Sequence, residues 1–341
     1  MPKGRTGARI ATAAALVGGA ATALGGVVLG VLGSQVLMAR WTIPGAEAPP
    51  PRCGGRYGRE FSDAEPIRLA VLGDSTAAGY GVHTRAQTPG ALLANAVAQA
   101  ARRPVQLVCP AVVGSPSAWL PAQAETVVDA GVDLAVIFIG ANDVTAGERM
   151  SKAVGYLAEA VRSLRNAGAQ VVVATCPDLG TIRPIRPPLR WVARQWSRQM
   201  ARAQRAAVEA AGATTVSLGD LLGPTFDADP ERMFGPDRYH PSALGYEKAV
   251  AVVLPAVFAA LRLPPTVDAA LRLPPTVDAA LRLPPTSDSA STSIADSAST
   301  SGGPASPLPA VPPVPTGPVL ASGVTADAAV PGPVAPDVAS A

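Results

Sequence analysis

Short apolar runs alternate with longer amphipathic segments through the middle of the chain. The runs are rich in Val, Ile and Leu and are mostly apolar on both faces, which is typical of buried parallel strands. Five of them are predicted to be strands: residues 68–72, 105–108, 134–139, 170–174 and 214–217. The longer segments are predicted to be helices: residues 89–101, 121–130, 151–167, 189–211 and 242–261. This alternation predicts a three-layer α/β/α domain over residues 65–261, with a parallel sheet in the middle.

An uncharged apolar segment precedes the domain. Residues 10–39 carry no charged side chain, exceed the roughly 20 residues that span a bilayer, and follow a short basic tail at residues 1–9. We therefore expect a transmembrane signal anchor that holds the domain outside the cytoplasm. The alternative is a cleaved signal peptide and a secreted protein. It is disfavoured because the candidate cleavage motif at residues 46–48 is followed by proline.

Stretches rich in proline flank the domain on both sides. Residues 40–64 are predicted to be a linker, because their Pro and Gly clusters disfavour helix and strand alike. Residues 262–341 continue a decapeptide, LRLPPTVDAA, which begins at Leu261, repeats at Leu271 and returns in altered form at Leu281. We expect a disordered tail that is partly polyproline II. A cell-wall-spanning or partner-docking role for this tail stays open.

Composition excludes one class of protein, and the net charge gives no support for another. Hydrophobic residues make up 48% of the 341 positions, which is too many for a wholly disordered chain. The formal net charge of +3 is small, so the charge balance gives no argument for a nucleic-acid partner, and we expect none.

Polar residues follow the predicted strands, directly or after a short loop. In open parallel sheets, ligands bind beyond the carboxyl ends of the strands, which meet at one edge. The segments after the first, second, third and fifth strands are Gly73-Asp74-Ser75, Gly114-Ser115, Gly140-Ala141-Asn142-Asp143 and Asp237-Arg238-Tyr239-His240. These side chains suit acyl transfer, so the sequence predicts an active site at that edge. Asp74 and Asp143 are expected to order their loops through hydrogen bonds.

The chain contains only two histidines, His83 and His240. This number excludes a metal site built on several imidazoles, and no clustered Asp or Glu motif suggests a carboxylate site, so we expect neither metal nor cofactor. His240 lies three residues after Asp237 and just before a predicted helix. His83 has no carboxylate nearby in the sequence and is expected to be a solvated loop residue. If a histidine acts as general base, His240 is the candidate.

The four segments, in this order, resemble the motif blocks of the SGNH hydrolase (GDSL-like lipase/esterase) family. The resemblance covers the α/β region and leaves out the anchor and the tail. The block around Gly114 is the loosest match, with Ser115 as a neighbouring candidate. The resemblance implies the SGNH hydrolase fold, a flavodoxin-like sheet of five parallel strands in the order 2-1-3-4-5.

The resemblance also implies a role for each site residue. Ser75 would be the nucleophile, His240 the base that takes its proton, and Asp237 the carboxylate that orients the imidazole. The backbone N–H groups of Ser75 and Gly114 and the side-chain amide of Asn142 would stabilise the oxyanion. A serine esterase of this kind cleaves carboxylic esters through an acyl-Ser75 intermediate. Its rate is expected to rise with pH through roughly 6–7, where an imidazole loses its proton.

The substrate and the acyl acceptor stay open at this point. Few aromatic residues and many Ala, Val and Leu favour a shallow pocket for short acyl chains, carried by a lipid or by an acylated glycan. One alternative to the esterase is an O-acyltransferase that passes the acyl group to a glycan hydroxyl. The other is a non-enzymatic, envelope-anchored interaction protein whose tail is the working part.

Arginines recur at every fourth residue on the helix predicted at 189–211, namely Arg190, Arg194, Arg198 and Arg202. At this spacing they lie along one slowly drifting stripe. We interpret the stripe as a solvated face whose long side chains cover apolar surface. Contact with anionic lipid or with an acidic substrate is the alternative. The loop at 177–188, rich in Pro and Arg, is expected to line or cover the acyl pocket.

Three cysteines are too few for a dense disulfide framework. Cys109 and Cys176 end the second and fourth predicted strands, which are not neighbours in the implied strand order, so no bridge between them is expected. Cys53 lies in the predicted linker. It could reach Cys109 in an oxidising compartment, and the spacing alone leaves that pairing open.

Overall fold

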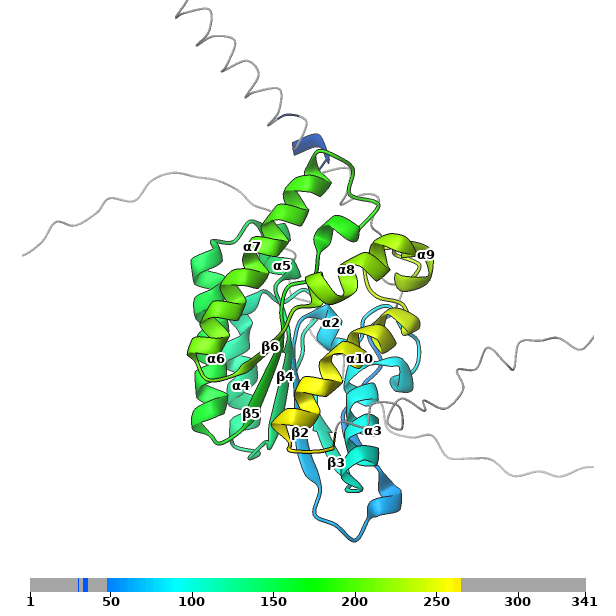
Figure 1. The fold of residues 1–341 in the computed structure, drawn as a ribbon, viewed down its shortest axis with the longest axis vertical. Coiled ribbons are helices and arrows are strands. Elements are labelled where there is room, and N and C mark those ends of the chain that lie inside the picture. The colour runs from blue at the N-terminus through cyan, green and yellow to red at the C-terminus, as the bar shows by residue number, and fades with distance from the viewer. Residues whose placement is uncertain (1–29, 31–32, 36–47, 265–341) are drawn as a thin grey trace, which may run out of the picture. The chain divides into compact units, whose positions relative to one another are not determined.

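A mixed sheet of six strands forms the middle of the part of the chain that the computed structural model describes, residues 30, 33–35 and 48–264 (Figure 1). The strands are β1 (Gly55–Tyr57), β2 (Ile67–Gly73), β3 (Val105–Val108), β4 (Leu134–Phe138), β5 (Gln170–Ala174) and β6 (Thr214–Val216). Their order across the sheet is β1-β3-β2-β4-β5-β6. Strands β2 to β6 are parallel, and without β1 they have the predicted order 2-1-3-4-5.

The edge strand β1 overturns two expectations. The sequence predicts five strands and a linker over residues 40–64, but residues 55–57 form β1 and a 3₁₀ helix, η1 (Arg59–Phe61), follows. β1 is antiparallel to β3, with Gly55 opposite Leu107, and the side chain of Tyr57 is buried. A strand of three residues has no periodicity to detect. It forms here because the edge of β3 offers unpaired backbone groups, and the local sequence does not show that edge.

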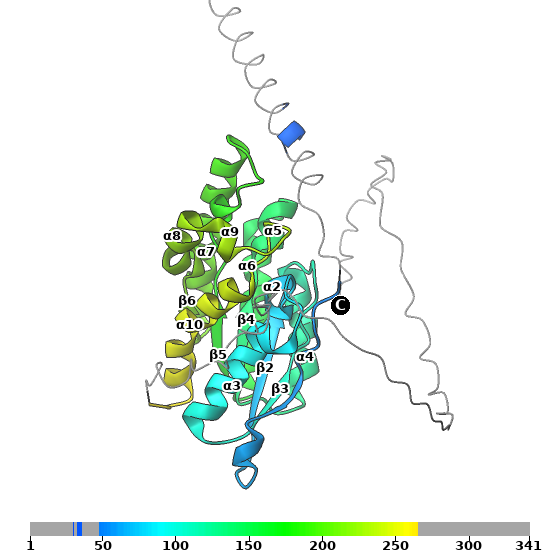
Figure 2. The same ribbon diagram turned by 90° about the vertical axis from the view of Figure 1, so that its right-hand side faces the viewer.

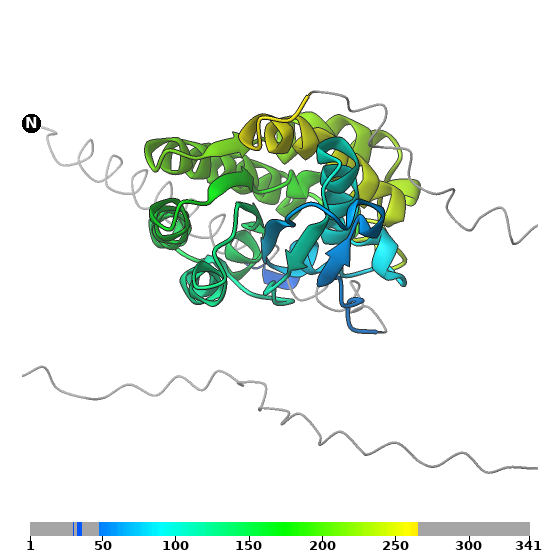
Figure 3. The same ribbon diagram turned by 90° about the horizontal axis from the view of Figure 1, so that it is seen from below.

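Long helices cover both faces of the sheet (Figures 1 and 3). The helices are α3 (Pro89–Ala101) and α10 (Ala243–Ala260) on one face, and α4 (Leu120–Val128), α6 (Met150–Asn166) and α7 (Leu189–Ala210) on the other. Each lies within a few residues of a predicted helix. The predicted α/β architecture with three layers is therefore confirmed.

The side chains of the central strands alternate between two apolar cores. In β4, Leu134, Val136 and Phe138 pack into the core beneath α3 and α10. Ala135 and Ile137 pack into the core beneath α4 and α6. Strands that are buried on both faces are continuous apolar runs, which is why the sequence revealed them so clearly.

Short helices gather at one end of the sheet, beyond the carboxyl ends of the strands (Figure 2). They are α2 (Ser75–Ala78), α5 (Ala141–Ala146), α8 (Leu218–Ala228) and α9 (Pro230–Met233), with the 3₁₀ helices η2 (Arg85–Gln87), η3 (Ser117–Trp119) and η4 (Leu179–Thr181). The sequence analysis did not predict α8. Its interior holds Pro224, which lacks the N–H that a helix interior uses.

Helix α10 is the one helix in the described part of the chain that is long and apolar enough to cross a membrane by length and composition alone. Tyr246, Val253, Leu254 and Phe258 of this helix are nevertheless fully buried in the domain. It is a core helix that packs against α3 and the sheet. The predicted basic tail and signal anchor and the predicted C-terminal tail lie almost wholly outside the described residues.

Candidate active site

Ser75 is the first residue of α2 and lies directly beyond the carboxyl end of β2. The Asp74 side chain caps this helix by accepting a hydrogen bond from the Thr76 N–H at 2.9 Å. Gly73 has a φ of 134°, and a Cβ at this position would collide with the carbonyl oxygen of Phe138. Glycine at position 73 therefore lets β2 approach β4 closely just before the nucleophile candidate.

A buried glutamine holds the same strand end in place. The Gln123 side chain accepts the Gly73 N–H at 2.8 Å and donates to the Gly73 carbonyl oxygen at 3.0 Å. Two fixed backbone groups leave the chain little freedom at the turn into α2. The strand end that leads into Ser75 is thus held by a residue on α4, 50 positions after Gly73 in the chain.

His240 lies in a closed loop between α9 and α10. The loop is closed by an antiparallel bridge between Phe234 and Pro241 and by a 2.8 Å hydrogen bond from the Gly235 N–H to the His240 carbonyl. The Nε2 atom of His240 is 2.9 Å from Ser75 Oγ. The structure therefore brings the two residues into hydrogen-bond contact.

Asp237 lies on the other side of the imidazole. Its Oδ2 atom is 2.6 Å from His240 Nδ1, and its Oδ1 atom accepts the backbone N–H groups of Tyr239 and His240, each at 3.0 Å. Burial by itself would raise the pKa of Asp237, but these hydrogen bonds outweigh it and hold the pKa below its ordinary value. An ionised Asp237 favours a proton on Nδ1 and leaves Nε2 free to accept from Ser75.

Asp74 and Asp143 order loops, as the sequence predicts. Asp143 is fully buried and accepts the N–H of Ser117 at 2.9 Å and its hydroxyl at 2.7 Å. Asp74 is only 2% exposed, and burial raises its pKa to about 6 against the opposing effect of the Thr76 N–H. The hydrogen bonds of Asp74 and Asp143 are thus made to Thr76 and Ser117, whereas Asp237 binds the imidazole of His240.

The three candidate oxyanion donors lie at the ends of three adjacent strands. Ser75 follows β2, Gly114 lies in the loop after β3, and Asn142 is on α5 after β4. Within the described residues, the backbone N–H groups of Ser75 and Gly114 have no hydrogen-bond partner. The N–H of Ser115, the neighbouring candidate, is already bonded to the Val112 carbonyl at 3.2 Å.

Hydrogen bonds tie these donors to one another. The Val112 N–H and the Ser115 hydroxyl both donate to the Gly73 carbonyl, at 3.1 and 3.0 Å. The Asn142 side-chain amide donates to the Ser115 carbonyl at 3.1 Å. Gly114 has a φ of 80°, a left-handed conformation that favours glycine. The turn that carries Gly114 is therefore attached to both β2 and α5.

A cavity of about 70 Å³ opens beside Ser75 and His240. One wall is the loop after β5, including Leu179 and Ile182, and the opposite wall is α8. The α8 wall and the inner end are mainly apolar and consist of Leu218, Leu222, Phe226 and Phe234. Ser75 therefore lies at a cavity whose lining is mainly apolar. Residues of the 177–188 loop line this cavity, as expected.

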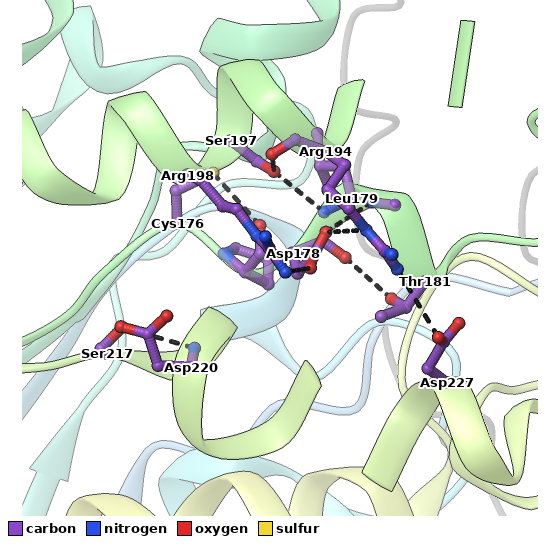
Figure 4. A network of polar contacts seen from close by, with 12 residues as sticks. Cys176, Asp178, Leu179, Thr181, Arg194, Ser197, Arg198, Ser217, Asp220 and Asp227 are labelled. Carbon is purple, nitrogen blue, oxygen red and sulfur yellow. Dashed lines mark hydrogen bonds and ion pairs between the residues drawn. The ribbon is translucent and has the colours of Figure 1, made fainter. Parts of the chain in front are cut away.

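Ion pairs join the two walls of this cavity (Figure 4). Asp178, in the β5 loop, is buried and accepts from Arg194 Nε at 3.3 Å and from Arg198 Nη2 at 3.1 Å. Asp227, on α8, pairs with Arg183 Nη2 at 2.9 Å and with Arg194 Nη2 at 3.7 Å. Arg194 thus bridges the loop and the helix. We call these five residues the pocket clamp.

The pocket clamp revises the interpretation of the arginine stripe. Arg194 and Arg198 are not only part of a solvated face, because they bind a buried carboxylate. Arg202 has no ion pair within the described part of the chain and fits the solvated interpretation. The sequence places Asp178 just after the fourth predicted strand, but the sequence analysis gave it no role and missed Asp227 altogether. The partners of both residues are distant along the chain, so the sequence does not show the ion pairs.

His83 is exposed in the turn after α2, and its backbone N–H donates to Gln87 Oε1 at 3.3 Å. The prediction of a solvated loop residue is therefore confirmed. Among residues that the structure describes, no group of three or more His, Cys, Asp or Glu side chains is arranged to hold a metal ion.

The fold and the site define a class of α/β proteins in which a serine, a histidine and an aspartate meet at the carboxyl ends of parallel strands, an arrangement suited to acyl transfer. Residues 71–248 match the GDSL-like Lipase/Acylhydrolase family. The GDSL-like esterase Rv1075c of Mycobacterium tuberculosis is 42% identical over 267 residues, which cover 74% of this chain and 84% of that protein. The chain belongs to the GDSL-like lipase/acylhydrolase (SGNH hydrolase) family and is a GDSL-like esterase, a carboxylic ester hydrolase.

Two solved structures are also similar to this chain. The crystal structure of TesA has a TM-score of 0.48 and 22% identity, and the match covers 57% of this chain and 99% of that one. The psychrotrophic esterase EstA from Pseudoalteromonas sp. has a TM-score of 0.46 and 18% identity, with coverage of 57% and 99%.

Proposed function

We propose that this esterase cleaves carboxylic esters through an acyl-Ser75 intermediate, with His240 as general base and Asp237 as its orienting carboxylate. The observation that carries the proposal is the continuous chain of contacts from Asp237 Oδ2 through His240 to Ser75 Oγ, with links of 2.6 and 2.9 Å. A serine hydroxyl is a weak nucleophile until an adjacent base takes its proton. The contact between Nε2 and Oγ is short enough for that transfer.

In the proposed reaction, Ser75 Oγ attacks the ester carbonyl carbon while its proton passes to His240 Nε2. The oxygen of the carbonyl becomes negative, and the N–H groups of Ser75 and Gly114 and the Asn142 amide stabilise it. The tetrahedral intermediate then collapses, and His240 returns the proton to the departing alcohol. Water, deprotonated by His240, attacks the acyl-Ser75 carbonyl, and the acid is released as His240 returns the proton to Ser75 Oγ. The unpartnered N–H groups of Ser75 and Gly114 support this assignment.

Asp237 supports the same mechanism electrostatically. Its lowered pKa keeps it ionised at neutral pH, where its charge stabilises the imidazolium that forms during proton transfer. The rise of the rate with pH as His240 loses its proton stays a prediction.

We further propose short acyl chains as the preferred substrates. The cavity beside Ser75 is small, about 70 Å³, and its lining is mainly apolar. Phe226 and Phe234 lie in contact edge to face, with ring centroids 5.1 Å apart, and both line this cavity. The alcohol part of the substrate is left open, because it would lie on the solvent side of Ser75.

The proposed location is the membrane, with the catalytic domain outside the cytoplasm. The uncharged segment 10–39 and the basic residues before it support this proposal. If the segment is cleaved, the protein is secreted. N-terminal sequencing of the exported protein distinguishes the two outcomes.

A fluorophosphonate probe and a panel of p-nitrophenyl esters from acetyl to palmitoyl test the proposed function. We expect the probe to label Ser75 and turnover to fall with acyl length. Normal turnover by the Ser75→Ala variant would overturn the proposal. Product analysis with and without a glycan acceptor separates hydrolysis from acyl transfer.

A further inference from the structure

Two of the three cysteines lie opposite each other at the edge of the sheet. Cys53 is two residues before β1, and Cys109 directly follows β3. In the antiparallel β1–β3 pair, Gly55 is opposite Leu107, so the same register continued outward puts Cys53 opposite Cys109. Residues opposite each other in an antiparallel pair have Cα atoms about 4.5–5.5 Å apart. Disulfides need about 4.4–6.8 Å, so the backbone geometry suits a bridge.

The two cysteines also share one apolar cluster. Both are free thiols in this structure, and Cys109 packs against the cluster to which Cys53 belongs. Cys53 is only 3% exposed, whereas Cys109 is partly exposed. The register places the two residues within the distance that a disulfide needs, so a bridge requires no large movement of the backbone.

The surroundings of Cys53 favour its thiolate. The neighbouring Cys109 side chain lowers the pKa of Cys53 to about 7 against the effect of burial, and the Thr88 hydroxyl and the Arg85 guanidinium act in the same direction. A thiolate is the form that attacks a disulfide. The neighbouring Cys53 and burial both raise the pKa of Cys109 well above the ordinary value.

We infer that Cys53 and Cys109 form a disulfide bond when the domain meets an oxidising compartment. The oxidant is a disulfide donor, such as an oxidised dithiol oxidoreductase or oxidised glutathione. The Cys53 thiolate attacks the donor disulfide, which forms a mixed disulfide and releases one donor thiolate. Cys109 then loses its proton and attacks the Cys53 sulfur, which forms the new bond and releases the second donor thiolate. Two electrons pass from the chain to the donor.

The bridge would fasten the arm that leads into the domain. Cys53 belongs to the N-terminal arm at residues 48–57, whose only strand has three residues. Cys109 begins the loop that carries Gly114, and its sulfur lies 3.8 Å from the Ala77 carbonyl in α2, the helix that begins with Ser75. A short edge strand opens readily. The bond would therefore hold this arm closed over β3, next to the loop beside the active site.

Cys176 supplies an internal control. It is buried at the end of β5, and no other cysteine in the described part of the chain contacts it. Burial raises its pKa well above the ordinary value, so its thiol is unreactive. Oxidation should therefore select one pair among the three possible pairings.

The test uses the full-length chain, purified in detergent, reduced, and then equilibrated with a mixture of oxidised and reduced glutathione. Remaining thiols are trapped with N-ethylmaleimide in denaturant, which exposes Cys176, and the peptides are mapped without reductant. We expect a Cys53–Cys109 cross-linked peptide and a modified, unpaired Cys176. We also expect the oxidised protein to unfold at a temperature on the order of 5–10 °C higher than the reduced protein.

Single variants separate this bond from other effects of oxidation. Cys53→Ser and Cys109→Ser should each abolish the cross-link and the difference in unfolding temperature, while Cys176→Ser keeps both. Ester turnover is followed in parallel, and its presence or absence does not bear on the inference. Alkylation of both Cys53 and Cys109 after equilibration, or stable glutathione adducts in place of the bridge, would overturn it.

Discussion

The Nε2 atom of His240 lies 2.9 Å from the Oγ atom of Ser75, although 165 positions separate the two residues in the chain. Each residue is held near the start of a helix, Ser75 at the start of α2 and His240 just ahead of α10. The buried Tyr246 hydroxyl of α10 donates to the Tyr80 carbonyl at 2.7 Å, which ties the two helices together. The contact therefore depends on how α10 packs, and not only on the loop that carries His240.

Removing the nucleophile or the base should abolish turnover without unfolding the domain. We expect Ser75→Ala and His240→Ala to lower kcat for p-nitrophenyl acetate by about 10⁴- to 10⁶-fold. The hydroxyl of Ser75 is small, so its loss leaves the packing intact. His83→Ala is the matched control, because His83 is exposed and does not line the cavity. Thermal unfolding checks that each variant is folded, and an active His240→Ala would contradict the assignment.

The Asn142 amide should matter more to the transition state than to substrate binding. We expect Asn142→Ala to lower kcat by about 10²- to 10³-fold, or about 3 kcal/mol, with little change in KM. The variant also loses the 3.1 Å bond to the Ser115 carbonyl. Asn142→Asp keeps the size of the side chain but repels the oxyanion, so it should be at least as slow. A purely structural role would instead change KM and the unfolding temperature together.

Breaking the pocket clamp should change the preference for acyl length. Asp227→Asn keeps the size of the side chain but removes the charge that holds Arg183 and Arg194. We expect the ratio of kcat/KM for octanoyl over butyryl esters to rise several-fold, because the α8 wall can then move outward. These pairs are partly exposed, so stability should fall by at most about 1 kcal/mol.

The control for the clamp is Arg232→Gln, which removes another exposed ion pair, with Asp229, at 3.6 Å. Neither residue of this pair lines the cavity. The control should keep the wild-type profile of rate against acyl length. An unchanged profile in Asp227→Asn would mean that the clamp does not limit the pocket.

Asp74 should make the domain less stable as pH rises. Burial raises its pKa from 3.8 to about 6 in the folded state. The folded protein therefore binds a proton that the unfolded chain releases, and this stabilisation is complete below pH 3.8 and lost as pH rises through about 6. Asp74→Asn still caps α2 but cannot ionise. We expect the free energy of unfolding of Asp74→Asn, relative to wild type, to rise by up to about 3 kcal/mol between pH 4 and pH 7.

Urea unfolding at several pH values measures this difference, and the comparison with wild type cancels the contributions of the other carboxylates. Asp237 acts in the opposite direction. Its folded-state pKa is lowered, so it stabilises the domain above the ordinary carboxyl pKa and this contribution is lost as pH falls. A difference between Asp74→Asn and wild type that does not change with pH would contradict the prediction for Asp74.

Much of the fold could be predicted because its signals are local. The parallel strands are continuous apolar runs, since both of their faces are covered, and the predicted bounds of β3 and β5 match the structure. The segments that contain Ser75 and Asn142 follow strands directly, and parallel strands bring their carboxyl ends to one edge whatever the details of packing. The candidate site was therefore predictable as a set of residues from pattern and resemblance together.

Other features depend on partners that are distant in the chain. β1 exists because the edge of β3 is open to it, and α8 forms despite Pro224 because its apolar side chains pack in the core. The strand of three residues has no local period, and in α8 the recurrence of Leu218, Leu222 and Phe226 at every fourth residue stands beside a proline that disfavours a helix.

The sequence by itself determined which segments form the five parallel strands and the long helices, and the chemistry available after those strands. Only the tertiary structure decided that Arg194 would bridge Asp178 and Asp227, and that Cys53 would lie opposite Cys109 rather than in a linker. Hydrophobic periodicity reports which face of an element is buried. Ion pairs and thiol contacts depend on the relative position of two elements to within about an ångström, and that position is set only when the whole core packs.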